Sequence, residues 1–387
     1  MDRLTAWREE FPLVERRTYL ISASLGPLSR RSRALAHEHL ELWGSLGPEE
    51  LWFEHGLPRL EECRERVARL IGADPDEIAV VPSVSAGLSA VATCLDFDER
   101  LKVVLTELDF PTNHYVWRAQ IRRGAKLDAV PSRDGVTIDE QEIVERIDHQ
   151  TVVVNVNRVL FESSWIVDLE PIVKAARDHG ALVVVDDFHG TGIVPVDVHA
   201  LGIDFYVTGA LKWLCGGQGI AFLYCRRDLI PRMEPLVVGW FGTEDPFRFD
   251  SSELRLRNDA RRFETGTYPL PQAWTAAGGL SIIEEVGVDT IRDRNRELTA
   301  GIVDRAGAAG LEVLSPLDPQ RRGGLVRVRI PGGPEAAEEL LRHLFEQDVV
   351  LDRRGDAFRI SPHFFNNESD LDRAFEEIGR GLRATGS

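Results

Sequence analysis

Residues 181–224 constrain this chain more than any other stretch, because three short apolar runs follow one another there. The runs cover 181–185, 204–207 and 220–224. Apolar runs of this length, bounded by polar residues and glycine, are typical of buried β-strands. Asp186 and His189 follow the first run, and Lys212 follows the second. The sequence therefore predicts an α/β fold with a carboxylate, an imidazole and an amine at one sheet edge, where such sheets bind ligands.

These three side chains together suit one kind of chemistry. A lysine amine forms a Schiff base with an aldehyde. Pyridoxal phosphate presents an aldehyde, and it needs a carboxylate beside its ring nitrogen because the protonated ring is the electron sink. Lys212 and Asp186 suit these two roles, and His189 suits a place beside the ring. Taken singly, the same residues also suit a solvated charge, a helix cap and a surface histidine, but the set favours the cofactor.

Three segments within residues 183–224 carry a family resemblance: VVVDDFH, VPVDV and DFYVTGALKWLCGGQGIAFLY. They resemble the aminotransferase class V family of fold-type I pyridoxal-phosphate enzymes, which includes kynureninases, cysteine desulfurases and isopenicillin N epimerase-like proteins. The resemblance extends over nearly the whole chain. It implies a large domain whose mostly parallel sheet is flanked by helices, a smaller C-terminal α/β domain, and a homodimer that binds pyridoxal 5'-phosphate.

The chain has 387 residues, which is typical of two domains. We expect residues 1–30 to form an N-terminal segment that contributes to the mouth of the site, or that packs as a simple arm. Residues 31–287 are expected to form the large cofactor-binding domain, with residues 30–70 helical. Residues 288–387 alternate helical and strand patterns, which favours a small α/β domain.

Composition excludes several partners. The net charge of −17 argues against nucleic acid and anionic membranes. No apolar run approaches the roughly 18–20 residues of a membrane span, and the start lacks an apolar signal core, so we expect a cytoplasmic protein. The cysteines form no CxxC pair and are expected to be buried thiols, and we expect no metal site. They are Cys63, Cys94, Cys215 and Cys225.

A candidate anion site follows the apolar run 78–81. Ser83 to Gly87 suit a strand-to-helix turn, whose free N–H groups and helix dipole attract anions. The resemblance implies that Val84 and Ser85 hold the cofactor phosphate here, although a plain serine N-cap gives the same pattern. Within DFPTN, the resemblance implies that Phe110 stacks on the cofactor ring, although core packing is the ordinary role of such a residue.

Two further residues come from later segments. In RRFETGTYPL, the resemblance implies that Thr267 reaches the phosphate bound by the partner subunit. In FRIS, Arg359 lies between Phe358 and Ile360, so on a strand it points to the opposite face from both. The resemblance implies that Arg359 clamps the α-carboxylate of the substrate. The alternative is a surface arginine on an edge strand.

The sequence constrains the type of reaction less than it constrains the identity of the cofactor. Cysteine desulfurases attack with a cysteine shortly before the clamp arginine, and residues 340–370 contain none, so we reject a persulfide mechanism. Aminotransfer needs only the lysine, the cofactor and a clamp, and it is our prediction. A kynureninase-like hydrolase or a lyase acting at Cβ comes second, because DFPTN and GWFG resemble that branch, and epimerisation comes third. Leu211 stands where many relatives have histidine, so Lys212 is the expected proton carrier.

The sequence disfavours two other classes of protein. A nucleotide-dependent oxidoreductase is disfavoured, because no GxGxxG turn follows a first strand and GGQG leads into a strand. A regulator that binds the cofactor without catalysis is disfavoured by the presence of Lys212, Asp186 and Arg359. A DNA-binding arm would favour that role, and the sequence shows none.

Overall fold

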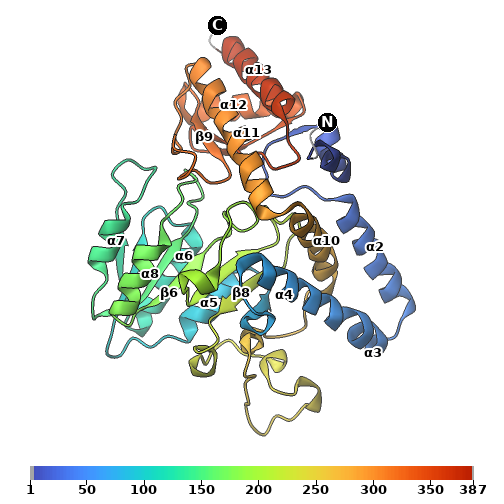
Figure 1. The fold of residues 1–387 in the computed structure, drawn as a ribbon, viewed down its shortest axis with the longest axis vertical. Helices are drawn as coiled ribbons and strands as arrows, with labels where there is room; N and C mark the ends of the chain where they lie inside the picture. The colour runs from blue at the N-terminus through green and yellow to red at the C-terminus, as the bar shows by residue number, and fades with distance from the viewer. Residues whose placement is uncertain (1–3, 386–387) are drawn as a thin grey trace.

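A computed structural model describes residues 4–385, and its centre is a seven-stranded sheet with the order β2-β8-β7-β6-β5-β3-β4 (Figure 1). β8 pairs antiparallel with β2 and β7, and the other neighbours are parallel. This confirms the predicted fold class. The strands are β2 (Ile78–Val81), β3 (Lys102–Thr106), β4 (Lys126–Val130), β5 (Thr151–Asn157), β6 (Leu182–Asp186), β7 (Phe205–Gly209) and β8 (Ala221–Cys225).

Among the seven strands of this sheet, β4 is the one that the sequence analysis did not predict. It is one of the two edge strands, and Lys126 and Asp128 within it are exposed or half-buried. Edge strands tolerate charged residues, so they lack the apolar run that reveals a central strand.

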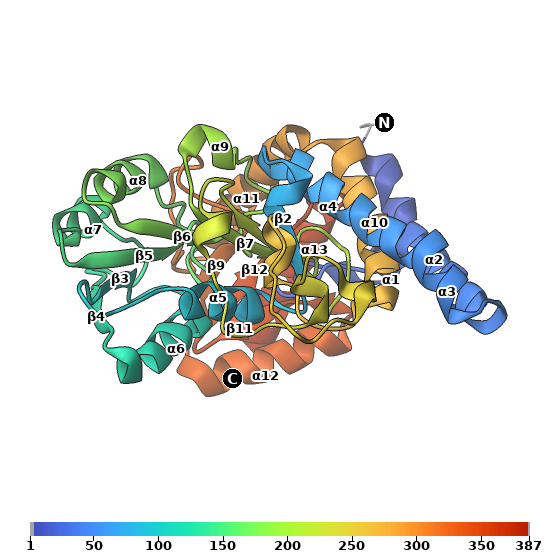
Figure 2. The ribbon, with the colours of Figure 1, turned by 90° about the horizontal axis from the view of Figure 1, so that it is seen from below.

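Helices cover both faces of the sheet (Figure 2). Alternate strand residues enter separate cores: Val183 and Val185 enter one, and Val184 enters the other. The first core contains residues of α4 (Leu57–Ile71), α7 (Glu140–Arg146), α8 (Leu169–Asp178) and α10 (Leu270–Val286). The second contains residues of α5 (Val84–Thr93) and α6 (Pro111–Gln120). Burial on both faces explains why the strands read as continuous apolar runs.

The C-terminal part has its own core, which includes Leu298, Val326 and Phe358. Its antiparallel sheet has the order β11-β12-β9. The expected alternation of helices and strands is present, although LEVLS contributes only a single bridge from Val313 to Val328. The elements are α11 (Val288–Ala308), β9 (Val326–Arg329), α12 (Gly333–Glu346), β10 (Val349–Val350), β11 (Asp352–Arg354), β12 (Ala357–Ile360) and α13 (Glu368–Thr385).

The N-terminal segment attaches to this C-terminal part, as Figure 1 shows in blue beside orange and red. After η1 (Thr5–Glu10) and α1 (Pro12–Arg16), strand β1 (Thr18–Tyr19) pairs in parallel with β10. Leu20 belongs to the C-terminal core, and Ile21 bridges to Ser361. The next residues therefore run beside the end of β12. The domain limits at 30 and 287 stay a prediction.

Residues 30–70 are helical as expected, apart from a break at residues 46–47, and the helical stretch is divided into several elements. The segment forms α2 (Arg30–Ser45), α3 (Pro48–Glu50), the π-helical η2 (Leu51–Gly56) and α4. Pro48 has no N–H to donate, and it begins a helix more readily than it continues one. The remaining short elements are η3 (Pro75–Glu77), η4 (Ile121–Arg123), α9 (Val198–Leu201), η5 (Ile230–Arg232), η6 (Trp240–Gly242), η7 (Pro246–Arg248) and η8 (Ala260–Phe263).

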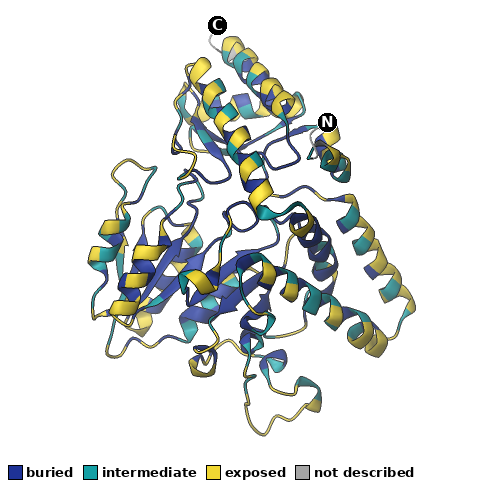
Figure 3. Ribbon diagram, in the orientation of Figure 1, coloured by how far each residue is buried: buried dark blue, intermediate teal, exposed yellow. Residues whose placement is uncertain are grey.

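Figure 3 shows the central strands buried and the outer faces of the helices exposed. The loop that contains η6 and η7 extends away from the sheet and is largely exposed. Within residues 4–385, no helix has the length and apolar character needed to cross a membrane.

Candidate functional site

The carboxyl ends of β6 and β7 lie beside a cavity of about 270 Å³. This volume is just below the range of about 300–1,000 Å³ typical of small-molecule sites. Thr267 does not line the cavity, but the other residues expected at the site do: Val84, Ser85, Phe110, Asp186, His189, Lys212 and Arg359. The sheet thus brings together side chains that the sequence spreads over 276 positions, from 84 to 359. Their individual roles remain predictions.

Lys212 lies on a tightly held turn after β7. The N–H of Gly26 donates to the carbonyl of Leu211 over 2.8 Å, and the N–H of Cys215 donates to the carbonyl of Lys212 over 3.1 Å. Gly26 packs so closely that a Cβ there would overlap the carbonyl oxygen of Lys212. Cys215 has a φ of 49°, an uncommon value for a residue with a side chain. The turn is therefore fixed from both sides, which gives the lysine amine a defined position.

The Lys212 amine is buried against an imidazole and an aromatic ring. Its Nζ lies 2.6 Å from Nε2 of His189 and 3.9 Å from the ring centre of Phe188. Burial lowers the pKa of Lys212 to about 7; Asp186 opposes this shift, and Arg359 and Arg354 reinforce it. Burial and the nearby Lys212 charge also hold the pKa of His189 well below its usual value. The site therefore favours a neutral imidazole and a lysine that is largely unprotonated just above neutral pH.

Asp186 is held by two hydrogen-bond donors. The amide of Asn113 donates to Oδ2 over 3.0 Å, and the N–H of Phe188 donates to Oδ1 over 3.0 Å. Asn113 is oriented in turn, because Asn155 donates to its Oδ1 over 2.9 Å and Asn157 accepts from its Nδ2 over 3.2 Å. The carboxylate and the three asparagine side chains are buried. The carboxylate thus keeps a fixed direction at the strand end.

Asp187, the next residue, faces the other side of the sheet and has a different environment. Its Oδ2 lies 2.8 Å from Nη2 of Arg158 and accepts the hydroxyl of Tyr206 over 2.5 Å. Burial raises the pKa of Asp187, and Arg158 opposes that rise. Arg158 also donates to the carbonyls of Val194 and Pro195. This carboxylate joins three parts of the core and does not line the cavity.

The start of α5 closes another side of the cavity. The hydroxyl of Ser83 caps the helix by accepting from the N–H of Ala86 over 3.1 Å. Val84 and Ser85 occupy the first turn, where helix N–H groups have no partner within the helix. The Ser85 hydroxyl lies 3.2 Å from that of Thr112. A helix start with two hydroxyls beside it suits a phosphate group.

Arg359 closes the opposite side. Phe358 and Ile360 enter the C-terminal core, and Arg359 points to the cavity, as the strand alternation predicted. Its guanidinium donates to the carbonyl of Phe161 over 2.6 Å, to the hydroxyl of Ser24 over 2.7 Å, and to Asp352. Burial lowers the pKa of Arg359, and Asp352 opposes that change. The arginine is therefore held in place by the N-terminal segment and by β11.

Phe110 and Thr267 are both expected to contact the cofactor, but they lie in different surroundings. Phe110 lines the cavity with its ring centre 5.8 Å from Lys212 Nζ, farther than Phe188. Thr267 is exposed on the loop after η8 and away from the cavity of its own chain. Five more lining residues, which the sequence patterns did not single out, are Ala23, Ser24, Thr112, Phe188 and Arg354. Phe188 had a signal, since it lies between Asp186 and His189 in the motif itself.

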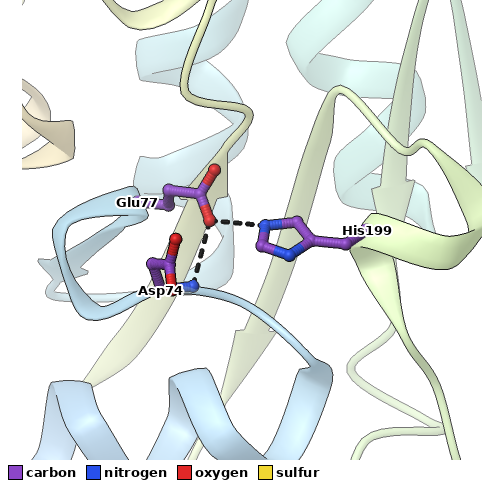
Figure 4. A group of neighbouring side chains, drawn as sticks. All are labelled: Asp74, Glu77 and His199. Atoms are coloured by element: carbon purple, nitrogen blue, oxygen red, sulfur yellow. Dashed lines mark hydrogen bonds and ion pairs between the residues drawn. The ribbon is translucent and has the colours of Figure 1, made fainter.

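A group of three residues whose side chains could bind a metal ion lies outside this cavity (Figure 4). It consists of Asp74, Glu77 and His199. Glu77 Oε2 lies 2.6 Å from His199 Nε2 and accepts the N–H of Asp74 over 3.0 Å. Arg227 contacts both carboxylates: its guanidinium donates to Asp74, and its backbone N–H donates to Glu77. These contacts connect η3, α9 and the chain after β8. The group is therefore explained as a junction between elements.

Comparison with known proteins shows which family this chain resembles. The family model described as aminotransferase class-V matches residues 56–361. An uncharacterized aminotransferase, YcbU of Bacillus subtilis (strain 168), is 33% identical over 96% of both chains. A kynureninase of Geobacillus thermodenitrificans (strain NG80-2) is 28% identical over 93% of this chain and 87% of that protein.

Solved structures share the fold at lower identity. The apo cysteine desulfurase of Thermococcus onnurineus NA1 has a TM-score of 0.88 at 22% identity, covering 98% of both chains. A variant of C-DES with glycine covalently linked to its pyridoxal-phosphate cofactor has a TM-score of 0.88 at 19% identity, covering 96% of this chain and 98% of that one. The family model covers most of the chain and YcbU nearly all of it, so the chain belongs to the aminotransferase class-V family of enzymes that use pyridoxal 5'-phosphate.

Proposed function

We propose that the protein is an aminotransferase that moves the amino group of an α-amino acid to a 2-oxo acid. The observation that carries this proposal is the placement of Lys212, Asp186 and Arg359 around one cavity. An amine, a carboxylate and a guanidinium there provide an attachment point, a partner for a cationic ring and a carboxylate clamp. Among the described residues that line the cavity, none is a cysteine, which supports the expectation of no persulfide chemistry.

The residues present fit the cofactor. Lys212 would hold its aldehyde carbon, Asp186 its ring nitrogen, and the start of α5 its phosphate. His189 Nδ1 is buried without a hydrogen-bond partner among the described residues, as expected where a ligand supplies one. When bound, pyridoxal 5'-phosphate supplies an aldehyde that condenses with amines and a cationic ring that withdraws electrons from the substrate Cα.

The side chains around the cavity bind the substrate, move its proton and exclude water. Arg359 orients the substrate carboxylate by paired hydrogen bonds. Lys212 Nζ takes the proton from the substrate Cα and would deliver it to the carbon that the cofactor aldehyde supplies, because the preceding residue, Leu211, cannot transfer a proton. His189 stays neutral and lies within hydrogen-bonding distance of that amine, which limits where the amine moves. Phe110 and Phe188 provide apolar cover that keeps water from the amine.

The rate of cofactor capture should depend on pH through Lys212. Only the neutral amine attacks an aldehyde, and burial lowers the pKa of Lys212 to about 7. We therefore expect the capture rate of cofactor-free protein to rise as pH increases through about 7 and to level off above it. The visible absorbance that develops after mixing measures this rate. A rate that keeps rising toward the ordinary lysine pKa of about 10.4 would contradict the buried amine.

Replacing Arg359 with alanine should weaken amino-acid binding far more than cofactor binding. We expect a loss of about 2–5 kcal/mol, because the substrate carboxylate would lack its paired donor in a buried site. Saturation of the cofactor absorbance change with added amino acid measures this loss. The matched control is Arg327→Ala, which lies across from Arg359 on β9 and pairs with Glu162 over 2.8 Å. Unchanged amino-acid affinity in Arg359→Ala would place the clamp elsewhere.

A kynureninase-like hydrolase or Cβ lyase is the second candidate, and the similarity to kynureninases over 93% of the chain favours keeping it. One experiment separates the two. The loaded enzyme is mixed with an amino acid, first without and then with a 2-oxo acid. Aminotransfer releases the matching 2-oxo acid stoichiometrically in the first case and catalytically in the second. Cleavage at Cβ instead releases a side-chain fragment repeatedly without any acceptor.

We further propose a homodimer in which Thr267 contacts the phosphate bound by the partner subunit. Thr267 is exposed on its own chain, and an apolar groove of about 550 Å³ is lined by the exposed side chains of Leu25, Leu28 and Leu40. Exposed apolar groups gathered in a groove mark interaction surfaces. Sedimentation of the loaded protein should give twice the chain mass of 43.3 kDa. A monomer with full cofactor occupancy would contradict this arrangement.

A further inference from the structure

Two arginines, not one, line the cavity, and one carboxylate connects them. Asp352 Oδ1 accepts from Nη1 of Arg354 over 2.6 Å, and Oδ2 accepts from Arg359. The Ser24 hydroxyl also donates to Oδ2. The carboxylate thus holds both guanidinium groups at the cavity from one side. Only Arg359 was singled out from the sequence.

The charges on this wall do not cancel. Two guanidinium groups face the single carboxylate of Asp352, which leaves one positive charge. The nearby Glu162 is paired with Arg327 over 2.8 Å, and Asp186 lies at the strand end with Asn113. The surplus is local, because the chain as a whole carries a net charge of −17. A cavity wall with this local surplus attracts anions.

The surroundings of Arg354 suit ligand binding better than structural support. Its side chain is 43% exposed, whereas that of Arg359 is 2% exposed. Among the described residues, its hydrogen bonds to Asp352 and to the carbonyl of Arg353 both come from Nη1. Nη2 and Nε are left for another acceptor. Arg353, by contrast, pairs with Glu338 and the carbonyl of Gly355, and it does not line the cavity.

We infer that the substrate is an amino acid with a second carboxylate. Arg359 binds its α-carboxylate deep in the cavity, and Arg354 binds the distal carboxylate nearer the solvent. Asp352 positions both arginines. The inference rests on the aminotransferase-type site proposed above, and it adds the substrate class and the residue that selects it. A guanidinium offers two parallel donors to a carboxylate, so Arg354 discriminates against an uncharged side chain of the same length.

Binding of simple carboxylates to the loaded enzyme tests this inference without any turnover. Calorimetry compares glutarate with pentanoate, which has the same number of carbons but one carboxylate. We expect glutarate to bind at least about tenfold more tightly, as expected for an added charged hydrogen-bond pair. Arg354→Gln should bring this ratio close to one, whereas the control Arg353→Gln should keep it. A wild-type ratio near one, or an unchanged ratio in Arg354→Gln, would overturn the inference.

Glutamate and alanine then separate this inference from the proposed function. If glutamate changes the cofactor absorbance at concentrations at least about tenfold lower than alanine, and Arg354→Gln removes the difference, both stand. If the two amino acids act at equal concentrations, the dicarboxylate inference fails and the proposed function survives. If no amino acid changes the absorbance of cofactor-loaded protein, both fail.

Discussion

Lys212→Ala protein should lose the yellow colour of the bound cofactor and should not turn over amino acids. The amine is the covalent attachment point and the expected proton carrier. We therefore expect turnover to fall by more than about a thousandfold, since general acid–base catalysis alone contributes about 10²–10⁴-fold. The substitution removes a side chain that is 8% exposed, so folding must be measured alongside by circular dichroism. Visible absorbance after adding cofactor and removing the excess gives the main result.

The control for this experiment is Lys174→Ala. Lys174 is exposed on α8 and pairs with Asp178 over 2.9 Å, a surface contact of little energetic weight. Its loss should leave colour and turnover within about twofold of the wild type. Retention of the cofactor-linked absorbance in folded Lys212→Ala protein would show that another amine forms the bond, and the assignment of the site would be wrong.

Asp186→Asn should preserve cofactor attachment but reduce turnover by about 10²–10³-fold. The change keeps the shape of the side chain and removes the charge that would stabilise a cationic ring, which is an electrostatic effect of that order. Because Asn155 fixes the orientation of Asn113, the donor facing Asp186 cannot readily become an acceptor. Steady-state kcat and the absorbance of the loaded protein are the two measurements. A kcat within a few-fold of the wild type would remove Asp186 from its assigned role.

The neighbouring Asp187→Asn provides the matched comparison. It leaves the buried Arg158 without its charged partner, and breaking a buried ion pair costs about 3–5 kcal/mol. We expect the free energy of unfolding to fall by that amount, while kcat per folded molecule stays within a few-fold. A large loss of kcat with unchanged stability in Asp187→Asn would show that Asp187 acts in catalysis and not in stabilising the fold.

The pattern of apolar and polar residues in short segments was sufficient to predict most of the large sheet and much of the site. Buried central strands read as apolar runs, so all but one of the strands of the large sheet were predicted, and the carboxyl ends of β6 and β7 placed Asp186 near Lys212. Strand alternation correctly turned Arg359 away from the core that contains Phe358 and Ile360. The edge strand at the β4 end of the sheet was missed, because its charged and exposed positions leave no apolar run to read.

The sequence by itself determined the fold class and the chemistry at the strand ends, because both follow from the order of apolar and polar residues within short segments. Only the tertiary structure decided which groups hold that chemistry in place. Asn113 contacts Asp186 from a helix 73 positions away, and Ser24 contacts Arg359 across 335 positions. Such contacts depend on how the sheet, α6 and the N-terminal segment pack, and no period of two or 3.6 residues records that packing.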